Sequence, residues 1–195
     1  MTAERELLEE TVGELARVSR PSASPGEREA AEWLAARLEA EGCSVRLEEE
    51  RVDGSEEWLQ EGMRAFASRH FPELPPDRTC FLNLETLGSP HELALVEGEG
   101  PLRIEDYPEW FRDFVADVAA EAGVGLRRGL RSRFSTDSVV ANRVGYPVAT
   151  LVSLNRWKAL ANYHWPTDTP ENVCYERIEE AVAVSEAVAR RLAER

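Results

Sequence analysis

The sequence predicts a domain of the α/β class. Helical and strand patterns alternate along most of the chain, the apolar run at 146–152 is typical of a buried strand, and an amphipathic helix is expected over 175–193. The chain has 195 residues, of which 43% are hydrophobic and 31% are charged. This length and composition are sufficient for one domain, residues 1–195, with a sizeable core.

The first third of the chain predicts two helices. Residues 4–19 carry apolar side chains at helical spacing, and a second helix is expected from residue 25 to about residue 41. Ser24 suits the N-cap of the second helix, Pro25 suits its first position, and Glu27 follows three residues after the cap, as in a capping box.

The remaining elements alternate between strands and helices. The alternating residues 43–48 predict a half-exposed strand, and a further helical pattern extends to residue 70. Strands are then expected at 79–84, 93–96 and 147–153, with helices at 107–121, 136–142 and 175–193. Ser135 or Thr136 is expected to cap the helix at 136–142.

Charge excludes several classes of partner. The net charge of −14 disfavours nucleic acids and anionic membrane surfaces, both of which require a basic face. No apolar run approaches the roughly 18 residues of a membrane span, and the N-terminus has no apolar signal core. The three cysteines lack C-x-x-C spacing, so reduced thiols and a cytoplasmic location are expected.

His164 is the strongest single candidate for chemistry. It lies on a proline-stiffened loop just after the predicted strand at 147–153, where open α/β sheets place functional residues. Its neutral imidazole can bind a metal ion, with Asp168 orienting it. The alternative is a loop histidine held by hydrogen bonds.

Acidic residues provide the other candidates. Glu56 and Glu57 open a predicted helix, where one carboxylate can hold a metal while its neighbour removes a proton from water. Alternatively, the two acids only complement the helix dipole. Glu85 follows an apolar strand, which suits a ligand or simply a solvated side chain. Thr136-Asp137-Ser138 is interpreted first as a helix cap.

Four arginines lie between residues 127 and 133. They suit either contact with a substrate carboxylate or a solvated basic face that balances an acidic protein.

The order of the motifs along the chain resembles that of the zinc-dependent aminopeptidase family. This family includes bacterial leucyl aminopeptidase, aminopeptidases S and Y and the related glutaminyl cyclases. The resemblance is most specific at Tyr163–Asn172, with the pattern Tyr-His-x-x-x-Asp-Thr-x-Glu-Asn. It also rests on residues 22–41, Glu56-Glu57, Asn83-Leu84-Glu85, Thr136-Asp137-Ser138 and Gly145-Tyr146-Pro147.

The resemblance implies a mixed, mostly parallel sheet flanked by helices and a site with two zinc ions. Glu56 matches the general base and Glu57 a ligand of one metal, whereas Glu85 and His164 match ligands of the other. Tyr163 matches a residue that helps to hold the tetrahedral intermediate, and Asp137 and Asp168 are expected to support the ligands. The implied activity is hydrolysis of N-terminal peptide bonds in a peptide or aminoacyl substrate by metal-activated water.

The sequence also departs from the family pattern. No His-x-Asp segment is present, and the segment with the bridging aspartate is absent, because residues 52–55 join the flanking regions directly. We therefore expect an internal deletion near 52–55, fewer strands than the family norm, and one zinc ion or none. The alternative function is a shortened, non-catalytic binding or assembly module, or a deletion remnant. Sheet edges left bare by the deletion suggest a homodimer.

Overall fold

A computed structural model describes residues 2–50 and 60–194. The chain divides into two compact units, Met1–Ala65 and Phe66–Arg195. The expectation of one domain stays a prediction, and the expected deletion at 52–55 lies outside the described residues.

The first unit contains α1 (Ala3–Ala16), α2 (Pro25–Ala40) and the start of α4 (Glu61–His70). The predicted cap of α2 is confirmed, since the Ser24 hydroxyl accepts a hydrogen bond of 3.2 Å from the Glu27 backbone N–H. The Glu27 carboxylate in turn accepts from the Ala23 N–H at 2.6 Å. In a capping box this second bond would come from the N–H of Ser24, which here donates to the Pro21 carbonyl instead.

Residues 43–48 form no strand in the structure, so this prediction was wrong. Their side chains are exposed except for the partly buried Val45, and Leu47 is 51% exposed. Alternation of polar and apolar residues indicates a strand only where a neighbouring strand edge and a core are available. The described residues provide no pairing partner for this segment.

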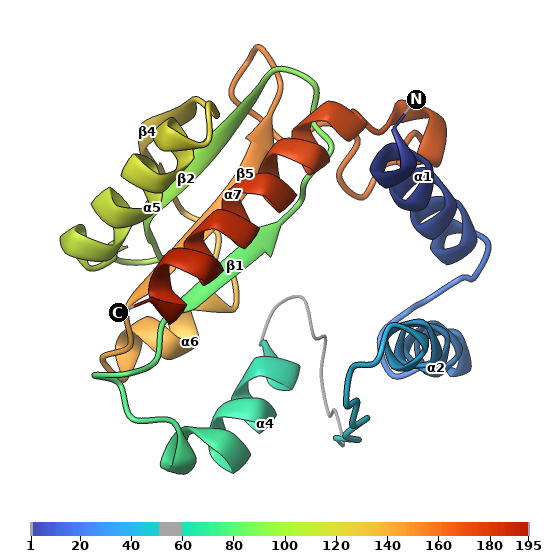
Figure 1. The fold of residues 1–195 in the computed structure, drawn as a ribbon, viewed down its shortest axis with the longest axis horizontal. Coiled ribbons are helices and arrows are strands. Elements are labelled where there is room, and N and C mark those ends of the chain that lie inside the picture. Colours follow the sequence, from blue (N-terminus) through green and yellow to red (C-terminus); the bar gives the residue numbers. More distant parts are fainter. Residues whose placement is uncertain (1, 51–59, 195) are drawn as a thin grey trace. The chain divides into compact units, whose positions relative to one another are not determined.

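The second unit is built on a five-stranded sheet, which confirms the mixed α/β fold (Figure 1). Its strands are β1 (Phe81–Glu85), β2 (Glu92–Glu99), β3 (Glu105–Asp106), β4 (Leu126–Ser132) and β5 (Val148–Leu154). β1 pairs with β5 in parallel, and β5 pairs with β2 in antiparallel. β2 also pairs with β4 in parallel and with the short β3 in antiparallel.

Two helices cover one face of this sheet. α5 (Glu109–Glu121) and α7 (Tyr175–Ala193) lie side by side across it (Figure 1). Alternate residues of β2 and β5 point toward these helices and form the main core with them. This core includes Leu93, Leu95, Ala149, Leu151, Phe111, Val115, Val184 and Val188.

The short helix α6 (Ser138–Arg143) packs on the opposite face. Thr150 of β5 points to this side and donates a 2.8 Å hydrogen bond to the Ser138 hydroxyl. Thr150 is next to Leu151 in the strand, so alternation places their side chains on opposite faces.

An aromatic cluster connects the end of α4 to the sheet. The rings of Phe66 and Phe71 approach Phe81 of β1 with centroids 6.5 and 5.5 Å away, and Phe71 lies 4.5 Å from Tyr146. The Tyr146 hydroxyl also donates to the Phe71 carbonyl at 3.2 Å. These contacts hold the 3-10 turn η1 (Phe71–Glu73) beside the beginning of β1 and β5.

The arginine-rich segment forms strand β4, which the sequence did not predict. Three of its arginines pair with acids inside the second unit: Arg127 with Glu92, Arg128 with Glu97 and Asp113, and Arg131 with Asp106. The segment is therefore an ion-paired strand. Within the described part of the chain, no helix has the length and apolarity required to cross a membrane.

Candidate functional site

Glu85 ends strand β1, as the sequence predicted, opposite Val152 of the parallel strand β5. Parallel strands bring their carboxyl ends to the same edge of the sheet, where α/β proteins bind ligands. The partly buried Glu85 carboxylate accepts a 2.7 Å hydrogen bond from the Thr86 hydroxyl. Thr86 has φ +42, so the backbone turns sharply directly after the candidate ligand.

His164 lies on the loop that follows β5 and is exposed. It has φ +59, and Asn162 in the same loop has φ +60. A left-handed conformation costs a residue other than glycine about 1–3 kcal/mol and is concentrated at functional sites. The Tyr163 ring meets the imidazole edge-on, with ring centroids 4.0 Å apart.

Asp168 lies four residues after His164 and is exposed. Its backbone N–H donates to the Trp165 carbonyl at 2.9 Å. The Asn172 amide donates to the Thr167 carbonyl at 2.9 Å, which ties the end of the loop together. The role of Asp168 in orienting His164 stays a prediction.

Asp137 begins α6 but makes no side-chain cap hydrogen bond. The expected cap by Ser135 or Thr136 was wrong, because Asp137 is the N-cap residue of α6. Thr136 instead donates from its N–H and from its hydroxyl to Glu99, at 3.0 and 2.8 Å. A supporting role for Asp137 stays a prediction.

Sequence reasoning missed Glu99, which is 1% exposed. Its carboxylate also accepts a 2.7 Å hydrogen bond from the Tyr107 hydroxyl. Burial raises the pKa of Glu99, and the hydrogen bonds from Tyr107 and Thr136 only partly oppose this effect. The pattern Glu-Gly-Glu-Gly at the end of an apolar strand was the available signal, since glycines permit close packing around an acid.

The loops of Glu85 and His164 are connected at this edge of the sheet. The Ser89 hydroxyl accepts a 2.9 Å hydrogen bond from the Ala161 N–H, three residues before His164. Ser89 itself lies four residues after Glu85. The structure therefore brings the two candidate loops together.

Glu56 and Glu57 lie outside the described residues. Within residues 2–50 and 60–194, no group of three or more histidine, cysteine or acidic side chains forms a possible metal site. The carboxylate of Glu85 and the imidazole of His164 are nevertheless donor types that bind zinc. That Glu57 supplies a further donor stays a prediction, because this residue lies outside the described part of the chain.

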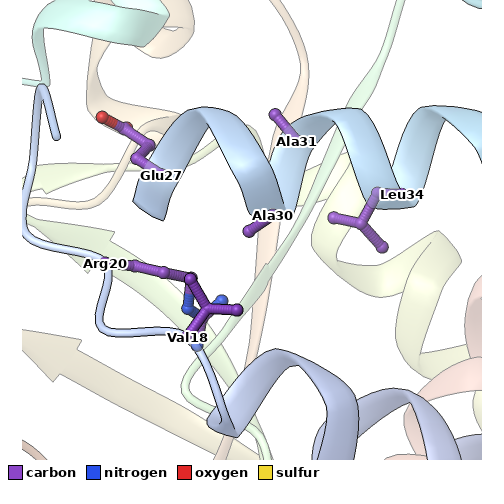
Figure 2. Close-up of a pocket in the computed structure, with 6 residues that line it drawn as sticks. All are labelled: Val18, Arg20, Glu27, Ala30, Ala31 and Leu34. Atoms are coloured by element: carbon purple, nitrogen blue, oxygen red, sulfur yellow. The ribbon is translucent and has the colours of Figure 1, made fainter. Parts of the chain in front are cut away.

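A hollow of about 490 Å³ lies in the first unit (Figure 2). Figure 2 shows it beside the start of α2, lined by Val18, Arg20, Glu27, Ala30, Ala31 and Leu34. None of the predicted site residues lines this hollow. We therefore place the candidate site at the sheet edge of the second unit.

Known structures share this fold. Two structures of BSAP, a zinc aminopeptidase from Bacillus subtilis, match with TM-scores of 0.55 and 0.53, each at 19% sequence identity. The match covers 71% of this chain but only 34% of the aminopeptidase chain, so this chain spans about a third of its length. No curated protein sequence matches the chain.

The family relationship rests on a separate comparison of sequences. The model of peptidase family M28 matches residues 43–189. That region includes Glu85, His164 and the whole sheet of the second unit. Because the match extends over most of the chain, the protein belongs to peptidase family M28.

Proposed function

We propose that this chain is a zinc-dependent exopeptidase of the aminopeptidase type. Family membership and the shared fold support a peptidase. The observation that carries the proposal is the placement of Glu85 and His164. They follow the carboxyl ends of the adjacent parallel strands β1 and β5, and each has a left-handed residue at or next to it.

In this proposal, the Glu85 carboxylate and the His164 imidazole would hold zinc, and the sequence offers Glu57 as a further ligand. The metal, when bound, supplies Lewis-acid activation of water and of the substrate carbonyl. Glu56 accepts a proton as the general base. The Tyr163 hydroxyl donates a hydrogen bond to the oxygen that develops negative charge. The substrate is a peptide or aminoacyl compound with a free N-terminus.

One observation favours a second function. Two of the family's metal-binding segments are absent between the regions that residues 52–55 join. A shortened member can act as a binding or assembly module that hydrolyses nothing. A cytoplasmic location and a homodimer are further proposals, supported by the cysteine pattern and by the β1 edge, whose strand pairs only with β5 among the described residues.

Metal content and activity separate the two functions. The peptidase should retain zinc after dialysis and cleave aminoacyl anilides. Glu56→Gln should abolish cleavage without removing the metal, because the substitution deletes the base and not a ligand. Zinc below about a tenth of an equivalent per chain contradicts the peptidase and favours the module, since a zinc site retains a stoichiometric ion.

A further inference from the structure

The loop that follows β5 differs in charge from the rest of the chain. The protein has 37 acidic and 23 basic residues, yet the sequence contains no acidic residue between Asp137 and Asp168. Arg156 and Lys158 lie within this stretch, and both are exposed. We call residues 155–165 the basic-aromatic loop. It is a positively charged segment in an otherwise acidic protein.

Aromatic side chains are exposed on the same loop. Trp157 and Trp165 are each 70% exposed, and Tyr163 is 39% exposed. Tryptophan, tyrosine and arginine are the residue types that are enriched in protein interfaces, because each offers a large contact area together with hydrogen-bond donors. The composition of the basic-aromatic loop is therefore that of a surface that binds another polypeptide.

Asn155 holds the tip of the loop in one conformation. Its side-chain carbonyl accepts hydrogen bonds from the backbone N–H groups of Trp157, at 2.9 Å, and Ala159, at 3.2 Å. Its backbone N–H donates to the Ala159 carbonyl at 2.8 Å, and its own carbonyl accepts from the Lys158 N–H at 2.9 Å. Lys158 has φ +63 in this turn. Because the turn is preformed, a ligand that binds there does not have to order the backbone.

Arg156 lies over the Trp157 ring, with its guanidinium carbon 4.1 Å from the ring centroid. Stacking uses the flat face of the guanidinium and leaves the N–H donors at its edge available to an acceptor. The described part of the chain provides no carboxylate partner for Arg156 or for Lys158. The stack therefore presents a planar donor to solvent, in the geometry that binds a carboxylate through two parallel hydrogen bonds.

A second arginine–tryptophan stack, in the first unit, shows which ligand suits this arrangement. Arg37 of α2 lies over the Trp33 ring at 5.2 Å, and its guanidinium pairs with the Glu10 carboxylate of α1 at 2.8 Å. There the arginine binds a glutamate from another element of the same unit. Arg156 on Trp157 offers the same pair of groups, so a carboxylate from outside the described chain is the matching ligand.

We propose that the basic-aromatic loop binds an acidic peptide segment, with one carboxylate on Arg156 and a second on Lys158. The Trp157 ring supplies apolar surface for the peptide between them. Charges farther away than about 8 Å are largely screened at physiological salt, so the two local cations matter more than the net charge of −14. Two cations suit a short acidic peptide, whereas nucleic acids require a more extended basic face.

This inference goes beyond the proposed function, because binding of the peptide requires neither a metal nor hydrolysis. The basic-aromatic loop also contains Tyr163 and His164. A peptide bound to the loop would therefore lie beside the candidate site.

The test is a fluorescence-anisotropy titration of the full chain, without added metal, with the peptide Leu-Phe-Glu-Asp-Glu. The peptide is acetylated at its N-terminus, so that an aminopeptidase cannot consume it, and it has a neutral fluorophore on a C-terminal amide. Leu-Phe-Gln-Asn-Gln, treated in the same way, is the uncharged reference. The acidic peptide should bind at least about tenfold more tightly, as expected for a hydrogen bond between charged groups. Its affinity should fall as salt is raised.

Four variants locate the binding surface. Arg156→Ala should lower the affinity for the acidic peptide about tenfold. Arg156→Lys retains the charge but loses the planar donor, so it should cause an intermediate loss. Trp157→Ala removes the ring that holds the guanidinium and should also weaken binding. Arg37→Ala is the matched control, because it removes an arginine from the other tryptophan stack, and it should retain wild-type affinity.

Several results would overturn the inference. They are equal binding of the two peptides, no binding of either, and equal losses in Arg156→Ala and Arg37→Ala. Analytical ultracentrifugation examines a different occupant, since self-association that Arg156→Ala abolishes would place a second copy on the loop and also overturn the inference. Zinc content and anilide cleavage are measured separately, so a chain that binds the acidic peptide but retains no zinc overturns the proposed function alone.

Discussion

Strand β2 and the end of strand β1 hold their glutamates in different surroundings. Glu97 and Glu99 of β2 are 7% and 1% exposed, and each accepts three hydrogen bonds from protein groups. Glu85 is less buried and, among the described residues, accepts its hydrogen bond from the neighbouring Thr86 hydroxyl. Carboxylates held by several protein donors serve the fold, whereas a carboxylate with more remaining acceptor capacity at a strand end can bind a ligand.

The two glutamates of β2 also differ from each other. Burial acts to raise the pKa of Glu97, but the Gly129 N–H and the guanidinium groups of Arg128 and Arg112 lower it overall. Burial likewise acts on Glu99, whose donors are neutral, and its pKa is raised. Burial acts to raise both pKa values, and it is outweighed only at Glu97, whose donors include two guanidinium groups.

The largest expected effect comes from breaking the Glu97 ion pair. Arg112 and Glu97 have side chains only 11% and 9% exposed, and their atoms are 2.9 Å apart. Arg112→Ala leaves a buried carboxylate with part of its charge uncompensated, which should lower the free energy of unfolding by about 3 kcal/mol. Urea unfolding measures this change.

Arg190→Ala provides the matched control, since its ion pair with Glu186 is largely exposed. Its effect on unfolding should be much smaller. Equal effects of the two substitutions would show that burial does not distinguish these ion pairs.

The next largest effect is on how the free energy of unfolding depends on pH, and it has opposite signs for Glu97 and Glu99. The folded-state pKa of Glu97 is lowered, so its stabilisation is present above the ordinary pKa and is lost as pH falls through the folded value. The folded-state pKa of Glu99 is raised, so its contribution is greatest below the ordinary pKa of 4.5 and is lost as pH rises through the folded value.

Glu97→Gln and Glu99→Gln should remove these two dependences separately. Near neutral pH, the free energy of unfolding of Glu97→Gln should fall furthest below that of wild type. At the same pH, the free energy of unfolding of Glu99→Gln should be most favourable relative to wild type. Urea unfolding at a series of pH values measures both. Parallel pH profiles for the two variants would contradict the assigned difference.

The smallest effect on stability is expected at Glu85. Glu85→Gln should change the free energy of unfolding by less than about 0.5 kcal/mol, as for most substitutions away from the core. It should nevertheless reduce zinc affinity at least about tenfold, since an amide is a poorer zinc ligand than a carboxylate. A large loss of stability without any change in zinc binding would place Glu85 with the structural glutamates.

Most of the second unit could be predicted from sequence. The run that contains β5 is apolar and bounded by turn residues, and α7 has helical spacing, so local patterns were sufficient. β4 was missed because its arginines suggest a solvated face. Their ion pairs with β2, β3 and α5 depend on residues distant in sequence. The strand expected at 43–48 was wrong for the opposite reason. Its local pattern is typical of a strand, but no described strand pairs with it.

The candidate site was only partly predictable. A strand-end acid and a loop histidine are visible as local patterns, and the structure connects their loops. The contact through Ser89 was missed because it depends on the Ala161 N–H, which only the fold brings within reach of the hydroxyl. Glu99 was missed for a similar reason, since its donors come from Tyr107 and Thr136.

X-ray absorption spectroscopy at the zinc edge tests the central claim that His164 binds zinc. The sequence contains three histidines, so His70→Ala and His91→Ala serve as controls. Zinc-loaded wild type should show imidazole scattering at about 2.0–2.1 Å, together with oxygen ligands. The imidazole signal should disappear in His164→Ala and persist in both controls. A zinc-loaded protein without imidazole scattering, or with the same scattering in His164→Ala, would contradict the account.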